Sequence, residues 1–163
     1  SPQAAVSGPM AEVVFRSLQY LSDIDLRAMT VYLRSLPVVE EPRMPVAASP
    51  PAALDSGRGV YRQHCVQCHG EQGEGVRGAF PPLAGNRAVM LPNATNLVRV
   101  VLQGGYLPAT AGNPRPHGMP PFMQSLRDEE IAAVLSYIRN AWGNQAPRVD
   151  TIDVYRAREG RGS

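Results

Sequence analysis

The stretch Tyr61-Arg-Gln-His-Cys65-Val-Gln-Cys68-His69-Gly70 decides how the whole chain is interpreted, because it contains the pattern Cys-x-x-Cys-His. Two thiols at positions i and i+3 of a helical turn face the same side, so each can form a thioether bond to one vinyl group of a haem. The next residue, His69, can then bring its imidazole beneath the same ring and bind the iron. This spacing predicts one covalently attached haem c, held by Cys65 and Cys68.

Other uses of the two cysteines fit the same residues less well. A thioredoxin-like pair opens a helix after a strand, whereas Cys65 and Cys68 follow a helical pattern. A zinc ion could draw on both cysteines and on His64 and His69, but neighbouring residues of one turn are badly placed to surround a tetrahedral ion. A single structural disulfide between the two cysteines is the third alternative. Two cysteines are too few for a scaffold held by several disulfides.

The iron needs its second axial ligand from a distant segment, and the stretch Gly118-Met119-Pro120-Pro121-Phe122 offers a methionine in a proline-rich loop. A thioether sulfur stabilises ferrous iron relative to ferric iron and raises the reduction potential, which suits an electron carrier. We therefore expect Met119 to be the ligand. Met123 and His117 are the rival ligands from the same part of the chain.

Two further residues are expected around the haem. The second ring nitrogen of His69 needs a partner, and a backbone carbonyl in the stretch Phe80-Pro81-Pro82-Leu83 can accept a hydrogen bond from its N–H, with Pro81 the favoured residue. Arg99 lies on a predicted helix from about Ala94 to Leu102, where its guanidinium could neutralise a haem propionate. A solvated helix face explains Arg99 equally well.

Apolar residues recur at helical spacing on both sides of the haem motif. The first run comprises Leu54, Gly57, Tyr61 and His64, and the second comprises Ile131, Val134, Leu135, Ile138 and Trp142. No hairpin signal or sustained alternation of polar and apolar residues accompanies them. With 16 Pro and 15 Gly among 163 residues, the sequence predicts an all-α fold of short helices joined by long loops.

The beginning of the chain contains a second copy of the last helix. Residues 21–34 align with residues 126–139 at a constant offset of 105, with Leu, Asp, Ala, Tyr and Arg at matching positions. No Cys-x-x-Cys-His precedes the first copy. We therefore expect residues 1–36 to be the C-terminal remnant of a preceding, related domain.

The remaining boundaries follow from composition. Residues 37–51 carry five prolines, which predicts a stiff linker, with a strap packed on one domain as the alternative. Residues 52–147 then form the haem-binding domain. Residues 148–163 lack a marked apolar face and predict a mostly disordered tail.

The ordered set of motifs resembles a class I cytochrome c domain over about residues 52–144. The set comprises Gly57 and Tyr61 at eight and four positions before Cys65, Cys-x-x-Cys-His, Pro-Pro-Leu, Met-Pro-x-Phe, and Tyr137 in the last helix. The resemblance implies that the first and last helices cross, with close approach at Gly57 and with Tyr61 packed near Tyr137.

Further details resemble the multihaem cytochrome c subunit of bacterial membrane-bound alcohol, gluconate and sugar dehydrogenases. They are Leu-x-Asp-Glu-Glu-Ile-Ala-Ala-Val-Leu in the last helix and Gly8-Pro9-Met10-Ala11-Glu12-Val13-Val14 near the start. Those subunits carry three such domains in tandem. The resemblance implies that residues 52–144 correspond to the third domain, and that Met10 sits at the axial-ligand position of the second.

The same resemblance implies an electron-transfer module and not an enzyme. Electrons would pass from a flavin or quinoprotein dehydrogenase through the haem to a quinone or another cytochrome. Thioether attachment implies maturation in a bacterial periplasm, at the periplasmic face of the inner membrane in the parent complex. The alternatives are a peroxidase-like catalyst and a sensor, both of which require a labile sixth ligand.

Composition excludes several other classes of protein. The formal net charge is +2, and no apolar run approaches the ~20 residues that a membrane-spanning helix needs. All 16 basic residues are Arg and lie scattered, which argues against nucleic-acid binding. We expect membrane association only through other parts of the parent protein or through partners. The apolar face of residues 10–36 predicts that this segment either frays or packs against a second copy of the chain or against the haem domain.

Overall fold

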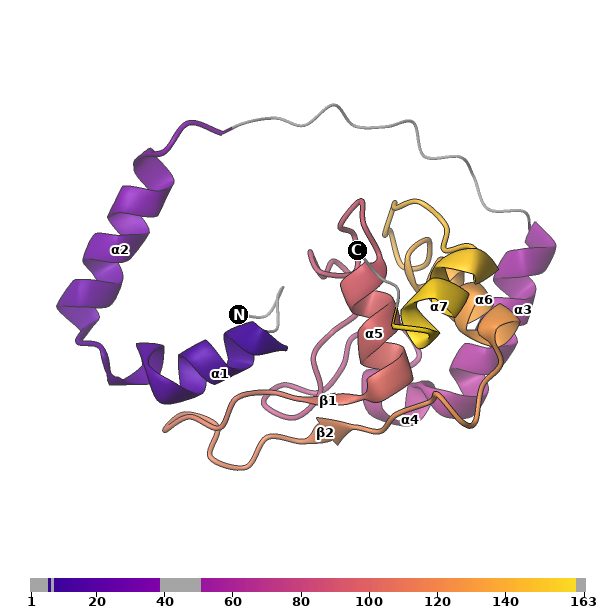
Figure 1. The fold of residues 1–163 in the computed structure, drawn as a ribbon, viewed down its shortest axis with the longest axis horizontal. Helices are drawn as coiled ribbons and strands as arrows, with labels where there is room; N and C mark the ends of the chain where they lie inside the picture. Colours follow the sequence, from indigo (N-terminus) through magenta and orange to yellow (C-terminus); the bar gives the residue numbers. More distant parts are fainter. Residues whose placement is uncertain (1–5, 7, 39–50, 161–163) are drawn as a thin grey trace.

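The computed structural model describes residue 6, residues 8–38 and residues 51–160, and Figure 1 shows the course of the chain. Its elements are mostly short helices, which confirms the all-α prediction, and a two-residue pair of strands that the sequence did not predict. In chain order they are α1 (Pro9–Arg16), the single-turn 3-10 helix η1 (Leu18–Tyr20), α2 (Asp23–Ser35), α3 (Pro51–His64), α4 (Val66–His69), α5 (Thr95–Gln103), β1 (Gly105–Tyr106), β2 (Gly118–Met119), α6 (Asp128–Ile138) and α7 (Thr151–Arg158).

Helices α3 and α6 cross in direct contact, which confirms the expected packing of the first and last helices of the haem domain. A Cβ atom added to Gly57 would lie 2.1 Å from the carbonyl oxygen of Ala133, so no side chain fits at the crossing. Tyr61 is buried beside it, and its ring centroid lies 5.6 Å from that of Tyr137 and 5.0 Å from that of Trp142. These contacts fix the helix that leads into the haem motif.

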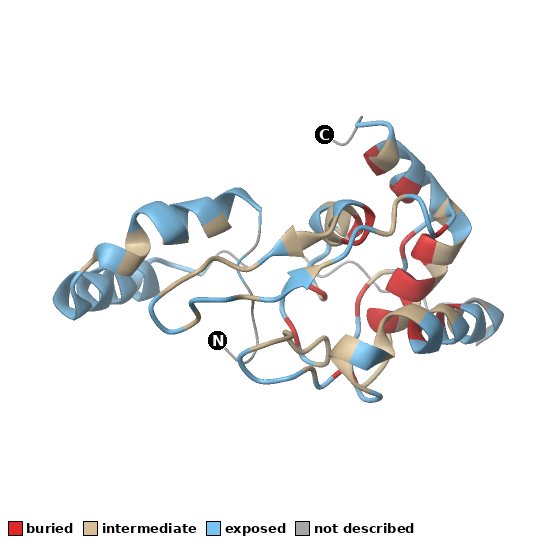
Figure 2. Cartoon of the chain, turned by 90° about the horizontal axis from the view of Figure 1, so that it is seen from below, coloured by how far each residue is buried: buried red, intermediate tan, exposed pale blue. Residues whose placement is uncertain are grey.

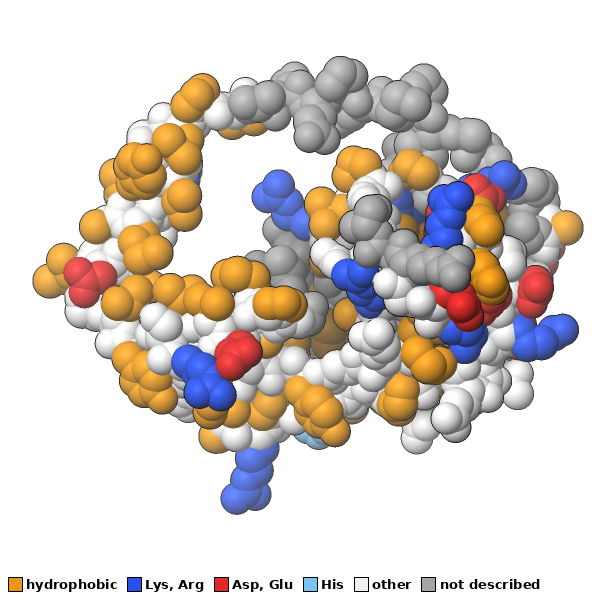
Figure 3. Space-filling model, in the orientation of Figure 1, with side chains coloured by type: hydrophobic (Ala, Val, Ile, Leu, Met, Phe, Trp, Pro, Cys, Tyr) orange, Lys and Arg blue, Asp and Glu red, His pale blue; other side chains and the backbone are white. Residues whose placement is uncertain are grey.

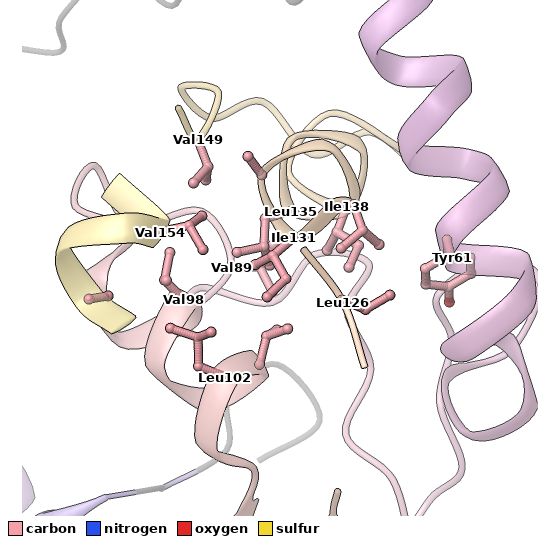
Figure 4. Close-up of a cluster of buried hydrophobic side chains, with 14 residues drawn as sticks. Tyr61, Val89, Val98, Leu102, Leu126, Ile131, Leu135, Ile138, Val149 and Val154 are labelled. Carbon is pink, nitrogen blue, oxygen red and sulfur yellow. The ribbon is translucent and has the colours of Figure 1, made fainter. Parts of the chain in front are cut away.

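The apolar core joins α5, α6 and α7, and most of the buried side chains drawn in Figure 4 lie between them, with Tyr61 apart on α3. Helix α6 supplies the largest share, because both sides of its apolar stripe are covered by neighbouring helices. The largest fully buried apolar side chains are Tyr61, Val89, Val98, Leu102, Ile131, Val134, Leu135 and Val154.

Helix α7 corrects one prediction, because the expected mostly disordered tail is wrong for residues 151–158. Val154 and Ala157 of this helix are buried against the core, although its other residues are largely exposed. Two apolar positions give little amphipathic signal in a sequence. The helix is stabilised by tertiary packing, which propensity does not reveal.

Strands β1 and β2 form a two-residue antiparallel pair, with Gly105 opposite Met119 and Tyr106 opposite Gly118. The backbone approaches closely here, since a Cβ atom on Gly104 would lie 2.4 Å from the carbonyl oxygen of Met119. Gly104 also has a φ angle of +71°, which favours glycine. The long connection between the strands lacks the short turn by which hairpins are recognised in a sequence.

Helices α1 and α2 contain no buried residue. Figure 2 colours them almost wholly as exposed, and Figure 3 shows apolar side chains along both. Ser22 caps α2 by accepting a hydrogen bond of 3.2 Å from the backbone N–H of Asp25. Most of the predicted linker, residues 39–50, and the last residues of the predicted tail, 161–163, lie outside the described residues. No helix in the described ranges has the length and apolar character to span a membrane.

Candidate haem site

The Cys-x-x-Cys-His motif lies where α3 ends and the single turn α4 begins. Cys65 is the residue between the two helices, and its carbonyl oxygen accepts the backbone N–H groups of Cys68 at 3.2 Å and of His69 at 3.0 Å. Both cysteines are half-buried free thiols on this one turn. The two sulfurs and the imidazole therefore come from a single turn of helix, as thioether attachment of a haem requires.

The acidity of the Cys65 thiol argues against thiol chemistry at this site. Burial raises its pKa to about 11, and the nearby Cys68 acts in the same direction. Redox-active and metal-binding cysteines need the thiolate, and their pKa values are usually lowered. Within the described ranges, no three His, Cys, Asp or Glu side chains gather as a zinc site would need.

His69 is held with one nitrogen fixed. Its Nδ1 lies 3.0 Å from the carbonyl oxygen of Pro81, and because a carbonyl only accepts, Nδ1–H is the donor. Burial lowers the pKa of His69 below its ordinary value, while the hydrogen bond to Pro81 acts in the opposite direction. In the neutral ring, Nε2 therefore carries a free lone pair that can bind a metal.

The loop that carries Pro81 is fastened to the haem motif by backbone contacts. The N–H of Gly75 donates to the carbonyl of His69 at 2.8 Å, and the N–H of Leu83 donates to the carbonyl of Gly73 at 2.7 Å. The hydroxyl of Tyr61 donates to the carbonyl of Gly70 at 2.7 Å. These bonds hold the carbonyl of Pro81 within hydrogen-bond distance of His69 Nδ1.

Met119 lies on β2, half-buried and packed against the core cluster, and Met123 packs on the same cluster. His117 is exposed, and its ring lies 5.0 Å from that of Phe80, next to Pro81. This contact joins the methionine loop to the loop that holds His69. The three candidate sixth ligands thus differ in burial, which favours the two methionines over His117.

Arg99 lies on α5 and is half-buried. Its pairing with a haem propionate stays a prediction.

Three buried polar residues that sequence analysis missed shape the loop between Pro82 and Pro92. Arg139 is fully buried and donates to the carbonyls of Val89 at 2.7 Å, Leu91 at 2.9 Å and Pro147 at 2.6 Å. Asn144 donates to the carbonyls of Leu83 and Ile138 and accepts the N–H of Gly85. Asn86 donates to the carbonyl of Pro82 at 2.8 Å. One signal was available, because Arg139 is among the residues shared with the first copy of the helix, as Arg34.

The residues present fit a covalently attached haem. Two thiols on one turn can carry thioethers, His69 offers a free Nε2, and a half-buried thioether on β2 offers the soft ligand typical of electron-carrying haem sites. This turn, leading from α3 where it crosses α6, defines a class I cytochrome c domain.

Comparison with known proteins supports the same class. A family model described as cytochrome c matches residues 54–142, more than half of the chain, and the chain therefore belongs to the cytochrome c family. The cytochrome c family, together with the cytochromes and dehydrogenase cytochrome subunits among the relatives, identifies it as an electron-transfer domain and not a catalyst.

Three relatives illustrate the range. The chain is 41% identical over 164 residues to the cytochrome c subunit of alcohol dehydrogenase (quinone) from Gluconobacter oxydans (strain 621H), covering 95% of this chain and 34% of that protein. It is 34% identical over 151 residues to the gluconate 2-dehydrogenase cytochrome c subunit of Pantoea cypripedii, covering 87% of this chain and 34% of that protein. It is 38% identical over 110 residues to a cytochrome c-552 of Thermus thermophilus, covering 66% of this chain and 73% of that protein. The chain spans about a third of the length of the dehydrogenase subunits.

Proposed function

We propose that this chain relays electrons through one haem c, attached at Cys65 and Cys68 and bound axially by His69 and Met119. The observation that carries the proposal is the hydrogen bond from His69 Nδ1 to the carbonyl of Pro81 at 3.0 Å. It leaves Nε2 as the only ring nitrogen free for a metal, on the same turn as two free thiols. A buried neutral histidine fixed in this way is the arrangement of a metal ligand.

A bound haem would supply one-electron exchange between ferric and ferrous iron. Cys65 and Cys68 would carry the thioether bonds, and His69 and Met119 would be the ligands of its iron. The carbonyl of Pro81 fixes the tautomer and direction of the His69 ring. Gly104, which has no side chain, lets α5 approach the backbone of Met119. We infer that Arg99, half-buried on α5, compensates a propionate.

The relatives support a place in a dehydrogenase complex. They include the cytochrome c subunit of alcohol dehydrogenase (quinone) and the cytochrome subunit of fructose dehydrogenase. We infer that a flavin or quinoprotein dehydrogenase is the electron donor, and that a quinone or another cytochrome is the acceptor. The bacterial periplasm is the compartment that thioether attachment implies.

The exposed helices α1 and α2 support a second partner surface. Neither buries a residue in the structure, and Met10, Met29 and Leu33 are all exposed apolar side chains. We infer that residues 10–36 pack on a neighbouring domain or on a second copy of the chain. Sedimentation of the holoprotein over a range of concentrations separates these two arrangements.

The experiment that tests the relay is a redox titration of the purified holoprotein, combined with mass spectrometry of the intact chain. The proposal predicts one haem per chain, resistant to acidic acetone extraction, and a single one-electron transition. Cys65→Ser and Cys68→Ser should each lose one of the two attachment bonds. A chain without covalent haem after expression with the cytochrome c maturation system would contradict the proposal.

A further inference from the structure

The last residue of α7, Arg158, makes contacts well away from its own helix. Its Nε atom lies 2.7 Å from Oδ1 of Asp128, at the start of α6. Its two terminal nitrogens donate to the carbonyls of Leu126, at 3.1 Å, and of Met123. The side chain is 24% exposed, so these bonds are only partly screened by water. A guanidinium, which donates in several directions within one plane, suits three acceptors from one segment.

The segment that Arg158 contacts leads directly from Met119 into α6. The same segment is also bound to α5, because the N–H of Phe122 donates to the carbonyl of Val101 at 3.0 Å and the N–H of Met123 donates to that of Leu102 at 3.1 Å. Met123 is therefore held through its N–H by α5 and through its carbonyl by α7. The segment has little secondary structure of its own, so these bonds determine its path.

Helix α7, which carries Arg158, is itself fixed to the apolar core. Val154 and Ala157 are buried in the same core cluster as Val98 and Leu102 of α5. The core therefore places both anchors of the segment, the carbonyls at the end of α5 and the guanidinium at the end of α7.

We propose that Arg158 is a positioning residue for the axial methionine, holding residues 120–126 so that the sulfur of Met119 stays on the iron. The inference rests on the proposed function, because it takes Met119 as the sixth ligand. In the haem-loaded protein, a looser segment would hold the sulfur of Met119 less firmly, and a small ligand from solution would then compete with it more readily.

The test uses the ferric holoprotein and imidazole as the competing ligand. At saturating imidazole the binding rate reports how often the methionine leaves the iron. We expect Arg158→Gln to raise this rate about tenfold, since one charge-assisted contact with several bonds is lost. Arg158→Lys keeps the charge near Asp128 but cannot serve all three acceptors, and it should give an intermediate rate. It also carries the test if Arg158→Gln does not fold.

The matched control is Arg156→Gln, which removes an exposed arginine from the same helix. It should bind imidazole at the parent rate. Far-UV unfolding of each variant separates positioning from loss of the fold, because the proposal requires faster imidazole binding at temperatures where the helices remain intact. Equal rates in the parent and both Arg158 variants would overturn it, as would an equal increase in Arg156→Gln. A parent protein without the sulfur-to-iron charge-transfer band would instead overturn the assignment of Met119 itself, before any variant is made.

Discussion

Helices α2 and α6 carry the same sequence pattern and have opposite environments. Helix α6 buries most of its residues, whereas α2 buries none. The matching tyrosines differ too, since Tyr137 packs on Tyr61 while Tyr32 is 64% exposed. A periodic pattern thus predicts that the helix forms, but packing against another helix determines how much it contributes to the stability of the fold. For α6 that partner is α3, whose Gly57 permits the contact.

The largest expected difference between the two copies is at their shared arginine. Arg139 is fully buried and donates to three loop carbonyls, whereas Arg34 is exposed. Arg139→Leu leaves these carbonyls without their donor and should lower the free energy of unfolding by about 3 kcal/mol. Arg34→Leu should change it by less than about 0.5 kcal/mol. Urea unfolding followed by haem absorbance measures both, and equal effects would remove the distinction between the copies.

The helix crossing gives the next largest effect. Gly57→Ala places a methyl group 2.1 Å from the carbonyl oxygen of Ala133, so α3 and α6 must separate, at a cost of about 2 kcal/mol. Gly59 lies on the same helix with nothing within 4 Å of an added Cβ atom. Gly59→Ala should therefore stabilise the protein by about 0.5 kcal/mol through helix propensity. Thermal unfolding of the two variants should shift in opposite directions, and a stabilised Gly57→Ala would refute the close crossing.

The stability of the protein at alkaline pH depends on the ionisation of the buried Tyr61. Burial raises the pKa of Tyr61 well above its ordinary value, so above about pH 10 the unfolded chain loses this proton before the folded one does. The contribution of Tyr61 to stability is therefore lost as the pH rises through the alkaline range. Tyr61→Phe should cost about 1 kcal/mol at neutral pH, through the lost hydrogen bond to Gly70, and should weaken the alkaline decline.

The exposed Tyr32 is the control for this experiment. Tyr32→Phe should leave both the neutral stability and the alkaline decline unchanged. The urea midpoints of the parent and both variants should be measured at several pH values from neutral to alkaline. If the stability of Tyr61→Phe falls with pH as steeply as that of the parent, the alkaline loss of stability comes from a group other than Tyr61.

The smallest expected effect concerns the residue directly before the helix in each copy, the N-cap. Ser22 caps α2 with its hydroxyl, but the corresponding residue before α6 is Arg127, where the carboxylate of Glu130 accepts the N–H of Arg127 at 2.9 Å. Arg127→Ser would supply the missing acceptor and should stabilise the protein by up to about 1 kcal/mol. The exposed ion pair that it removes contributes little. A lowered melting temperature would show that the present cap is already complete.

Sequence analysis predicted the parts of this molecule that depend on spacing. The close crossing at Gly57, with Tyr61 packed near Tyr137, was implied by the resemblance to class I cytochrome c domains. The Cys-x-x-Cys-His pattern implied one helical turn, because helical periodicity brings such residues to one face. The core helices were predictable for the same reason.

Contacts between distant segments were not predictable from the sequence. Helix α7 depends on two buried residues and on bonds from Arg158 to a loop some 30 positions earlier. The buried Arg139 is satisfied by carbonyls almost 50 residues away. A sequence pattern records which residues are polar but not where their partners lie in the fold.

The most direct test of the account is the sulfur-to-iron charge-transfer band in the absorption spectrum of the ferric holoprotein. The account predicts that the parent protein has this band, that Met119→Ala loses it, and that the neighbouring Met123→Ala keeps it. A parent spectrum without the band, or loss of the band in Met123→Ala alone, would contradict axial binding by Met119 and with it the proposed closed, electron-carrying site.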